Sequence, residues 1–419
     1  MWLLLAFVAA ASMAHYTFAI WSVNQPAHFS DLYAPWWGAH ELLLHARSPY
    51  SPQVAHEIQT MIYGAPLSPS PEDPSGIGGG FAYPPWTAFL LWPTLYLPFP
   101  VAQAFVIAKS IAATLLALAL WLRALRLRAS PLQVLTIAIF LLGSFPTLQG
   151  LRLENLSLLA AALIAITLFL MYADHLILAG VCLALSTFKP QFTVALVPWL
   201  ALWTLADWRR RRSLAAGFLA TMLLFLAISQ WLLPAWLPSF LRVLRAYRHY
   251  TYGHSLLDVW LTPRFGVVAS AAVLLAVWAL CWRDRRQPAN SPRFLLASSL
   301  LLAATVVVIP SLAPHVQLLL LPGMLCLLRD RATLVSSGVV SRLGLLAAWV
   351  VLAWPWVAAF ALLLARLWLP AAELHRFWQL PLYPSPILPL TVLAALTTLY
   401  LRGSAPTPPP SFADVPPVA

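Results

Sequence analysis

Few side chains in this chain could carry out acid–base chemistry, and one of them stands apart from the others. Asp31 is the first charged side chain of the sequence, among aromatic residues in the stretch FSDLYAPWWGAHELLLHARSPY, residues 29–50. A carboxylate there could act as a general base on an incoming hydroxyl group. It could equally be the N-cap of an interfacial helix, since aspartate favours that position. The residue alone leaves both roles open.

Lys189 is the cation with the most unusual setting. It lies between two apolar segments, in Phe188-Lys189-Pro190-Gln191. An ionisable group at such a depth in a membrane is costly and is usually functional. A lysine near the end of an apolar segment can also extend its ammonium group to the interface. Binding of an anion and simple exposure at the interface are therefore both compatible with this position.

Other cations follow later in the chain. Arg242, Arg245 and Arg248 recur every three residues, so one face of a helix could present all three. That face could hold a phosphate group, or it could be a stripe exposed to solvent and lipid headgroups. His254 and His315 join this set as candidate phosphate- or substrate-binding residues.

A lone carboxylate, several cations and many aromatic residues are the parts that a transferase acting on a phosphate-linked lipid needs. Cations hold the phosphate leaving group. The carboxylate deprotonates the acceptor hydroxyl, and aromatic rings contact sugar faces and a prenyl chain. The acidic residues show no paired spacing that would hold Mg²⁺ or Mn²⁺, so we expect no metal and no other cofactor.

The chain must hold these groups in a membrane. Of its 419 residues, 61% are hydrophobic and only 9% are charged, whereas about a quarter of residues are charged in a soluble protein. Several continuous apolar runs approach the roughly 20 residues that cross a bilayer as a helix. The composition therefore predicts an all-α polytopic membrane protein.

The net charge of +12 does not point to nucleic acid. A basic balance would suggest a nucleic-acid partner in a soluble protein. Here the arginines form short clusters between apolar runs, which is typical of cytoplasmic loops that face anionic lipid. We therefore expect membrane lipids, and not nucleic acid, as partners.

The apolar runs predict about twelve transmembrane helices. They lie at residues 2–21, 101–122, 132–148, 156–172, 176–188, 192–205, 214–233, 266–282, 294–309, 316–328, 343–364 and 387–401. The short apolar piece 86–97 is not counted as a span, because an extra span there would move every later loop to the opposite side of the membrane. With a cytoplasmic N-terminus, five arginine clusters obey the positive-inside rule, although Arg242, Arg245 and Arg248 then lie on the outer side. The five clusters are 123–128, 209–212, 283–293, 329–331 and Arg402.

This orientation describes a multi-pass protein of the cell (plasma) membrane with both termini in the cytoplasm. Residues 22–100 form a large first outer loop with interfacial helices, and the candidate site faces outside. Residues 1–402 form one domain, and the Pro-rich residues 403–419 are predicted to be a disordered cytoplasmic tail. We expect residues 1–14 to be retained in the first helix rather than cleaved as a signal peptide, because no Lys or Arg precedes their apolar core.

The order of several short motifs adds a further indication. In chain order they are Asp31-Leu32-Tyr33, Ser48-Pro49-Tyr50, Tyr83-Pro84-Pro85, Leu97-Pro98-Phe99-Pro100-Val101-Ala102, Asn155, Ala179-Gly180 and Phe188-Lys189-Pro190-Gln191. Over residues 20–212 this ordered set resembles glycosyltransferase family 87, the polyprenyl-phosphate-mannose-dependent mannosyltransferases of the GT-C fold. A Gly-Gln pair commonly precedes the asparagine in that pattern, whereas Leu153-Glu154 precede Asn155 here.

The resemblance implies a GT-C-like helical bundle with Asp31 as catalytic base. It also implies a polyprenyl-phosphate sugar as donor, with mannose as the expected sugar, and chemistry on the outer face. The acceptor would be a lipid or glycan hydroxyl, and a single displacement would invert the anomeric configuration. The expected donor-phosphate and substrate-binding residues are Lys189, Arg245, Arg248, His254, His315, Tyr33, Tyr83 and Asn155.

Other classes of protein remain open at this point. A flippase or transporter of phosphate-linked lipids would use the same cations and groove but would need no base. A polytopic scaffold that only recruits partners would need neither the phosphate-binding cations nor the base. A ligase that transfers a whole glycan from a lipid diphosphate is the related enzymatic alternative.

Overall fold

The computed structural model describes residues 1–26, 28–251, 253–336 and 338–402. Helices make up 75% of the protein, and no strand occurs in those ranges. The prediction of an all-α protein is therefore confirmed. The predicted tail, 403–419, lies outside the described residues.

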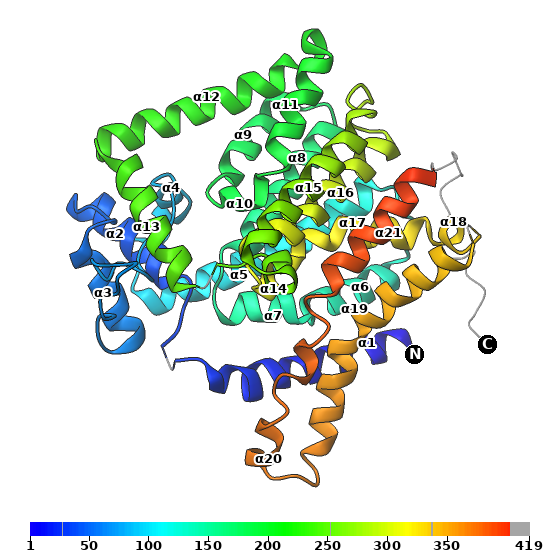
Figure 1. Ribbon diagram of the computed structural model, residues 1–419, viewed down its shortest axis with the longest axis horizontal. Helices are drawn as coiled ribbons and strands as arrows, with labels where there is room; N and C mark the ends of the chain where they lie inside the picture. The colour runs from blue at the N-terminus through cyan, green and yellow to red at the C-terminus, as the bar shows by residue number, and fades with distance from the viewer. Residues whose placement is uncertain (27, 252, 337, 403–419) are drawn as a thin grey trace.

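The helices follow one another as shown in Figure 1. The first half of the chain holds α1 (Trp2–His15), η1 (Tyr16–Trp21), η2 (Ser22–Asn24), α2 (Tyr33–His45), α3 (Pro52–Tyr63), α4 (Thr87–Leu91), η3 (Trp92–Thr94), α5 (Phe99–Ala124), α6 (Pro131–Leu142), α7 (Phe145–Arg152), α8 (Ser157–Tyr172), α9 (Leu176–Ser186), α10 (Pro190–Thr193) and α11 (Leu196–Ala206). The second half holds α12 (Trp208–Leu232), α13 (Trp236–Tyr250), α14 (Leu256–Leu261), α15 (Pro263–Trp282), α16 (Pro292–Val308), η4 (Pro314–Leu320), α17 (Leu321–Arg329), α18 (Arg331–Ser336), α19 (Val339–Ala365), α20 (Ala371–His375), η5 (Leu380–Leu382) and α21 (Leu388–Arg402).

Several helices are long and apolar enough to cross a membrane. Five segments of the described chain meet this condition: 2–24, 99–124, 208–232, 263–282 and 341–365. The pair α6 and α7 adds a sixth if it forms one span, although the pair is bent by 55°. The bend has a local cause, because Ser144 leaves the helical conformation and its Oγ caps the start of α7. The protein is therefore a multi-pass membrane protein.

All twelve apolar segments predicted from the sequence lie on helices. Those not among the five or six spans coincide with shorter apolar helical segments: 157–172, 176–186, 196–206, 292–308, 314–329 and 388–402. These are shorter than the roughly 20 residues that a straight helix needs to cross a bilayer. Length and composition thus support five or six spans, fewer than the twelve that we expected.

The predicted outer loop, residues 22–100, contains short helices as expected. Ser51 caps α3 by accepting a hydrogen bond from the backbone N–H of Val54, and α3 ends at Gly64, whose φ of +81° suits glycine. The apolar piece 86–97 forms only α4 and η3, so it does not span. In Figure 1 these helices, with α13, form a group at the left of the bundle.

Two glycines bring α9 and α12 into backbone contact. A Cβ atom on Gly180 would lie 2.3 Å from the carbonyl oxygen of Leu214, and a Cβ on Gly217 would lie 2.2 Å from that of Ile177. Small residues let membrane helices approach this closely. The crossing fixes α9, which leads directly to Lys189.

The long helices separate two polar regions. The first residue of α5, Phe99, packs against Tyr33 and Trp36 next to Asp31, with ring centroids 4.9 and 5.1 Å apart. Its other end carries Arg123. Likewise α8 begins two residues after Asn155 and ends at Tyr172, to which Arg126 donates a hydrogen bond. Candidate site residues therefore gather at one end of these helices and arginines at the other.

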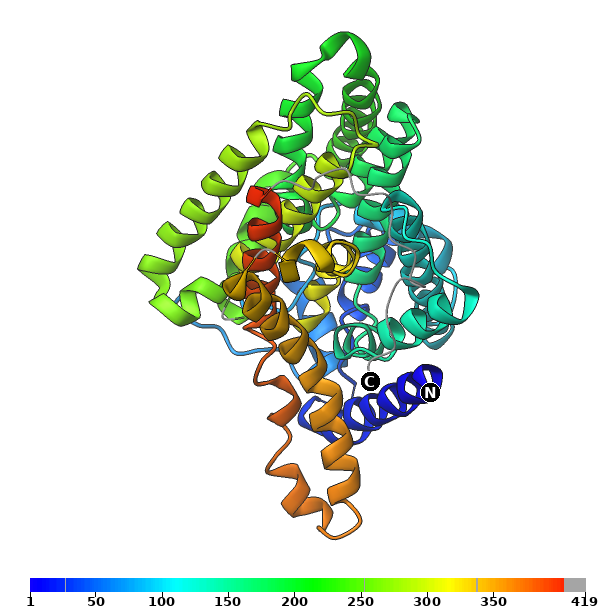
Figure 2. The same ribbon diagram turned by 90° about the vertical axis from the view of Figure 1, so that its right-hand side faces the viewer.

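The C-terminal helices pack on the first helix. Trp356 of α19 donates a hydrogen bond to the carbonyl oxygen of Gly143, between α6 and α7, at 3.0 Å. Tyr16 of η1 donates to the carbonyl oxygen of Trp378 at 2.7 Å. Figure 2 shows the end of α19 and the chain that follows it projecting below the rest of the molecule.

Candidate active site

Asp31 is held by the segment that joins α7 to α8. Its backbone N–H donates to the carbonyl oxygen of Leu153 at 2.8 Å. Its side-chain Oδ2 accepts a hydrogen bond from Nδ2 of Asn155 at 2.6 Å. The side chain is half-buried, and Oδ1 has no hydrogen-bond partner among the described residues. One carboxylate oxygen is thus anchored while the other is free to accept a proton.

Asp31 does not fill the N-cap role that the sequence left open for it, because the N-cap residue of α2 is Leu32. Oγ of Ser30 accepts hydrogen bonds from the backbone N–H groups of Leu32 and Tyr33, both at 3.2 Å. The same hydroxyl donates to the carboxylate of Glu154. Ser30 therefore satisfies the start of α2, and the Asp31 side chain is left to point at Asn155.

Glu154 is a second carboxylate beside Asp31, and it fastens the same two segments together. It is buried, and its Oε1 accepts a hydrogen bond from Gln103 at 3.1 Å. Its φ of +54° is a left-handed conformation that non-glycine residues rarely adopt. Such strain is found where the surrounding contacts hold a functional segment in place. Loss of solvent raises the pKa of Glu154, and the Asp31 charge adds to this effect.

The side chain of Asn155 links Asp31 to Lys189. Its Oδ1 accepts hydrogen bonds from the Lys189 ammonium group at 2.7 Å and from the backbone N–H of Ser157 at 2.9 Å. Because both partners can only donate there, the amide nitrogen must face Asp31. One asparagine therefore positions the carboxylate and the ammonium group relative to each other.

Lys189 is 5% exposed and lies between α9 and α10. Its Nζ also donates to Oγ of Ser157 at 2.9 Å and lies 5.8 Å from the ring centroid of Tyr83. No carboxylate of the described residues lies within ion-pair distance, and the third N–H of the ammonium group has no hydrogen-bond partner there. Burial lowers the pKa of Lys189 to about 8, although the Asp31 charge opposes this. The group is suited to hold an anion.

Loss of solvent is also the main influence on Asp31. It raises the pKa of the carboxyl group, while the hydrogen bond from Asn155 and the charge of Lys189 lower it. The net shift is upward, which makes the carboxylate a stronger base than an exposed aspartate. A raised pKa in a general base brings it nearer to the operating pH.

Four tyrosines surround this carboxylate. Loss of solvent raises the pKa of each phenol, and the negative charge of Asp31 raises it further: the four are Tyr63, Tyr83, Tyr247 and Tyr250. The hydroxyl groups of Tyr63 and Tyr250 hydrogen-bond to each other, which ties α3 to α13. The site is therefore bounded by rings with polar ends.

Sequence reasoning missed three of these tyrosines. Tyr247 and Tyr250 lie three residues apart on α13, on the same helix face as the buried Val243 and Ala246. Tyr250 is half-buried, and Tyr247 is 39% exposed. Residues three apart on one helix face were considered only for the arginines of this helix, so these tyrosines were overlooked. Tyr63 lies outside the short motifs of the sequence, and no pattern around it indicated a functional role.

His315 belongs to the same region. It is buried in η4, and its backbone N–H and ring Nδ1 both lie near Oε1 of Gln149, at 3.1 and 3.2 Å. An amide oxygen only accepts, so Nδ1 carries the proton and Nε2 remains free for another partner. The Lys189 charge acts on this ring, which places the two residues near each other.

The structure does not bring the remaining candidates to Asp31. Arg245 and Arg248 are exposed on α13, and His254 is half-buried after that helix. Within the described residues, none of the three contacts Asp31 or Lys189. Tyr33 packs in the aromatic group next to Asp31, where it stacks on Trp37 with a centroid distance of 6.1 Å.

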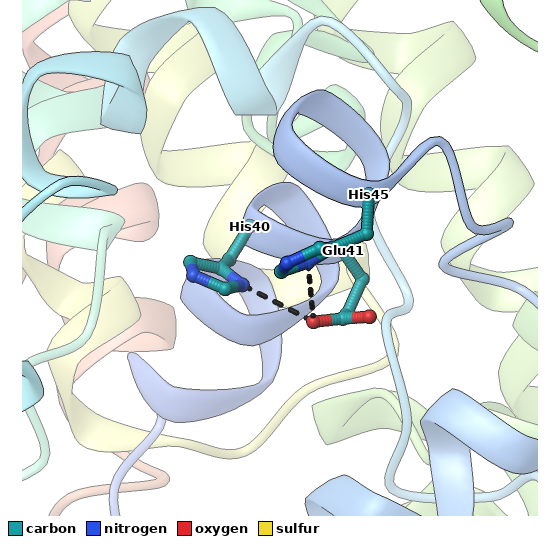
Figure 3. Close-up of side chains that lie close together, drawn as sticks. All are labelled: His40, Glu41 and His45. Atoms are coloured by element: carbon teal, nitrogen blue, oxygen red, sulfur yellow. Dashed lines mark hydrogen bonds and ion pairs between the residues drawn. The ribbon is translucent and has the colours of Figure 1, made fainter.

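Figure 3 shows a further polar cluster on α2. Nδ1 of His40 and Nδ1 of His45 each lie 3.1 Å from Oε1 of Glu41, and the three ligand atoms lie within 4.8 Å of one another. Arg47 occupies the other oxygen of Glu41 at 2.6 Å and also binds Glu57 at 2.6 Å. The buried carboxylate is thus neutralised by this arginine, and the cluster fastens α2 to α3.

The fold and the site define a polytopic helical membrane protein with a carboxylate–amide–ammonium site at one end of its bundle. The model of glycosyltransferase family 87 matches residues 81–310, more than half of the chain, and the chain therefore belongs to this family. It is a membrane glycosyltransferase, a transferase of EC class 2.4, with a sugar donor and an acceptor as its partners.

The matched range bears on the individual residues. It includes Tyr83, Asn155, Lys189, Arg245, Arg248 and His254, while Asp31, Tyr33 and His315 lie outside it. Comparison with curated proteins and with solved structures gave no match.

Proposed function

We propose that this glycosyltransferase moves a single sugar, with mannose as the expected one, from a polyprenyl-phosphate donor to a hydroxyl group of a lipid or glycan. The observation that carries the proposal is the arrangement of Asp31 and Lys189 on the two ends of one asparagine amide. It provides a free carboxylate oxygen beside a buried cation with a free N–H. A hydroxyl and a lipid phosphate are the reactants that such a pair would serve.

In the proposed reaction, Oδ1 of Asp31 takes the proton of the acceptor hydroxyl. The hydroxyl oxygen forms a bond to the anomeric carbon, and the bond from that carbon to the phosphate oxygen breaks. The polyprenyl phosphate leaves with the electron pair, so no general acid is required. A single displacement of this kind inverts the anomeric configuration, because one carboxylate acts only as base.

Lys189 would stabilise the charge on the departing phosphate. A charge-assisted hydrogen bond from a buried ammonium group is stronger than one in water, because the surroundings screen it less. Nε2 of His315 is a second candidate partner for that phosphate. Tyr83, with the other tyrosines near Asp31, would contact the sugar. Arg245, Arg248 and His254 would act on the donor only if α13 and the following loop change position.

The distribution of charge supports a site on the outer face of the cell membrane. Arginine clusters lie at the ends of α5 and α8 that are remote from Asp31, and the positive-inside rule assigns such clusters to the cytoplasm. We therefore place both termini in the cytoplasm. We also propose a GT-C-like bundle in which the shorter apolar helices complete about twelve transmembrane segments.

The test is a mass-spectrometric analysis of membrane glycolipids in a strain that lacks this protein. The strain is complemented with wild type, with Asp31→Asn, or with Glu72→Gln as a matched control that removes an exposed carboxylate from the same loop. A species one hexose or pentose heavier should return with wild type and the control. Asp31→Asn should lower its rate of formation roughly 10²–10⁴-fold.

Other outcomes would redirect the proposal. Full restoration by Asp31→Asn would contradict the role of this residue as base and would favour a flippase or transporter. A product with retained anomeric configuration would contradict the single displacement. An increment larger than one sugar would favour transfer of a whole glycan.

A further inference from the structure

A basic cavity lies at the end of α5 that is remote from Asp31. It has a volume of about 480 Å³, and its polar lining consists of Arg123, Arg126, Arg128 and Tyr172. No carboxylate lines it, and no described acidic residue forms an ion pair with any of the three arginines. Three positive charges therefore converge on one cavity without a negative charge to balance them.

Aromatic contacts hold two of these arginines in place. The guanidinium carbon of Arg123 lies 5.7 Å from the ring centroid of Phe169, and that of Arg126 lies 6.0 Å from the ring centroid of Tyr172. Nε of Arg126 also donates to the Tyr172 hydroxyl at 3.3 Å. These contacts orient the guanidinium groups without neutralising them. Their remaining N–H groups can bind an anion.

The backbone at this place is strained. Arg126 has a φ of +54°, a left-handed conformation that costs a non-glycine residue energy. It turns the chain sharply after α5, so Arg126 and Arg128 line the same cavity as Arg123. Such strain persists where the surroundings fix it, and it is typical of ligand-binding segments.

The surfaces beside the cavity are apolar and open. Leu115 and Leu116 of α5, and Leu132 and Leu135 of α6, are exposed. Because α5 is long and apolar enough to span the membrane, and α6 begins a bent candidate span, we expect these side chains to face hydrocarbon. A ligand with an anionic head and apolar chains would complement both the arginines and the leucines.

We propose that this cavity is a binding site for an anionic phospholipid, with the headgroup phosphate among the three arginines and the acyl chains along α5 and α6. The site is separate from the proposed sugar-transfer site, since the 26 residues of α5 lie between them, a length of about 39 Å at the rise of an α-helix. The bound lipid would connect α5, α6 and the end of α8.

Lipid binding to the purified full-length protein in detergent micelles tests this proposal. The probes are dioleoyl phosphatidylglycerol, dioleoyl phosphatidylcholine and inorganic phosphate, and the readout is native mass spectrometry with competition. The test variant is Arg123→Gln/Arg126→Gln. The matched control is Arg209→Gln/Arg210→Gln, which removes the same charge from two exposed arginines at the start of α12. If the test variant does not fold, Arg128→Gln replaces it.

We expect wild type and the control to bind phosphatidylglycerol in preference to phosphatidylcholine. The test variant should bind phosphatidylglycerol roughly tenfold more weakly. Equal loss in both double variants would overturn the proposal, because the binding would then reflect overall charge. No loss in the test variant would also overturn it, because the lipid would then bind elsewhere. Displacement of the lipid by inorganic phosphate at equal concentration would also overturn it, since the cavity would then serve a soluble anion.

Discussion

At the scale of single residues, one amide couples the two charged groups of the site. Asn155 donates to Asp31 and accepts from Lys189, so one side chain holds both groups in place. Loss of solvent raises the pKa of the Asp31 carboxyl group and lowers the pKa of the Lys189 ammonium group. Asp31 can act as a base only above its pKa, where it is ionised. Lys189 can bind the phosphate charge only below its pKa, where it is protonated.

This arrangement predicts a bell-shaped dependence of kcat/KM on pH. On the acid side, activity falls as Asp31 takes up a proton, and its raised pKa moves that fall above the range of an ordinary aspartate. On the alkaline side, activity falls near pH 8, where Lys189 loses its charge. Lys189→Arg should move the alkaline fall upward, because a guanidinium group stays protonated.

The control for this prediction is Lys109→Arg, which makes the same change at the only other lysine of the sequence. It should leave the alkaline limb near pH 8. An unchanged alkaline limb in Lys189→Arg would show that another group titrates there. The measurement is the initial rate of sugar transfer between pH 4 and pH 10 with a fixed detergent and ionic strength.

Glu154 provides a second prediction at this scale. Its carboxylate accepts from Ser30 and Gln103, and the peptide next to it accepts from Asp31, so it positions the base without touching substrate. Glu154→Ala should lower kcat roughly tenfold or more with little change in KM, because a small misplacement of a reacting group is costly. Glu154→Gln, which can still accept from Ser30, should keep most of the activity. Equal losses of kcat in the alanine and glutamine variants would contradict a positioning role and would point to a need for the charge itself.

At the scale of elements, the α9–α12 crossing determines where Lys189 lies. Gly180→Ala would place a methyl group 2.3 Å from the carbonyl oxygen of Leu214, so the helices would have to separate. We expect a loss of about 1–3 kcal/mol in stability, measured as a lower midpoint of thermal unfolding in detergent. The control is Gly344→Ala in α19, where the added methyl group meets open space. Equal midpoints for the two variants would show that the crossing tolerates separation.

The helices could be predicted from the sequence because burial in a membrane demands long apolar runs. The segment predicted at 101–122, for example, is α5 at Phe99–Ala124. The number of spans was harder to predict, since helices such as α9 and α11 are apolar but short. The bend between α6 and α7 did have a local signal, because Gly143-Ser144-Phe145-Pro146 combines a glycine at a helix end, a serine N-cap and a proline in the first turn of α7. The single segment predicted at 132–148 passed over it.

The site was predictable in part. Asp31, Asn155 and Lys189 were each singled out, but their contact joins residues 124 and 34 positions apart, which no local pattern reveals. The three-residue spacing of the arginines on α13 was noted in the sequence, but such spacing cannot show which face of the helix turns inward. The face that holds the buried Val243 and Ala246 also carries Tyr247 and Tyr250, whereas the three arginines lie on the opposite, exposed side of the helix.

At the scale of the whole molecule, the separation of the Asp31 site from the arginine clusters predicts which side of the membrane each region faces. The test uses single cysteines on a Cys182→Ala background, because Cys281 and Cys326 are buried. Ser68→Cys lies in the first outer loop, and Asn290→Cys lies between α15 and α16; both positions are exposed. A membrane-impermeant maleimide should label the cysteine at 68 in intact cells. It should label the cysteine at 290 only after lysis, because the arginines that precede it hold that loop in the cytoplasm. Labelling of both positions in intact cells would show that an even number of spans separates them, in contradiction to the predicted topology. Labelling of the cysteine at 290 alone would put the Asp31 site in the cytoplasm. A nucleotide-linked sugar would then become the expected donor.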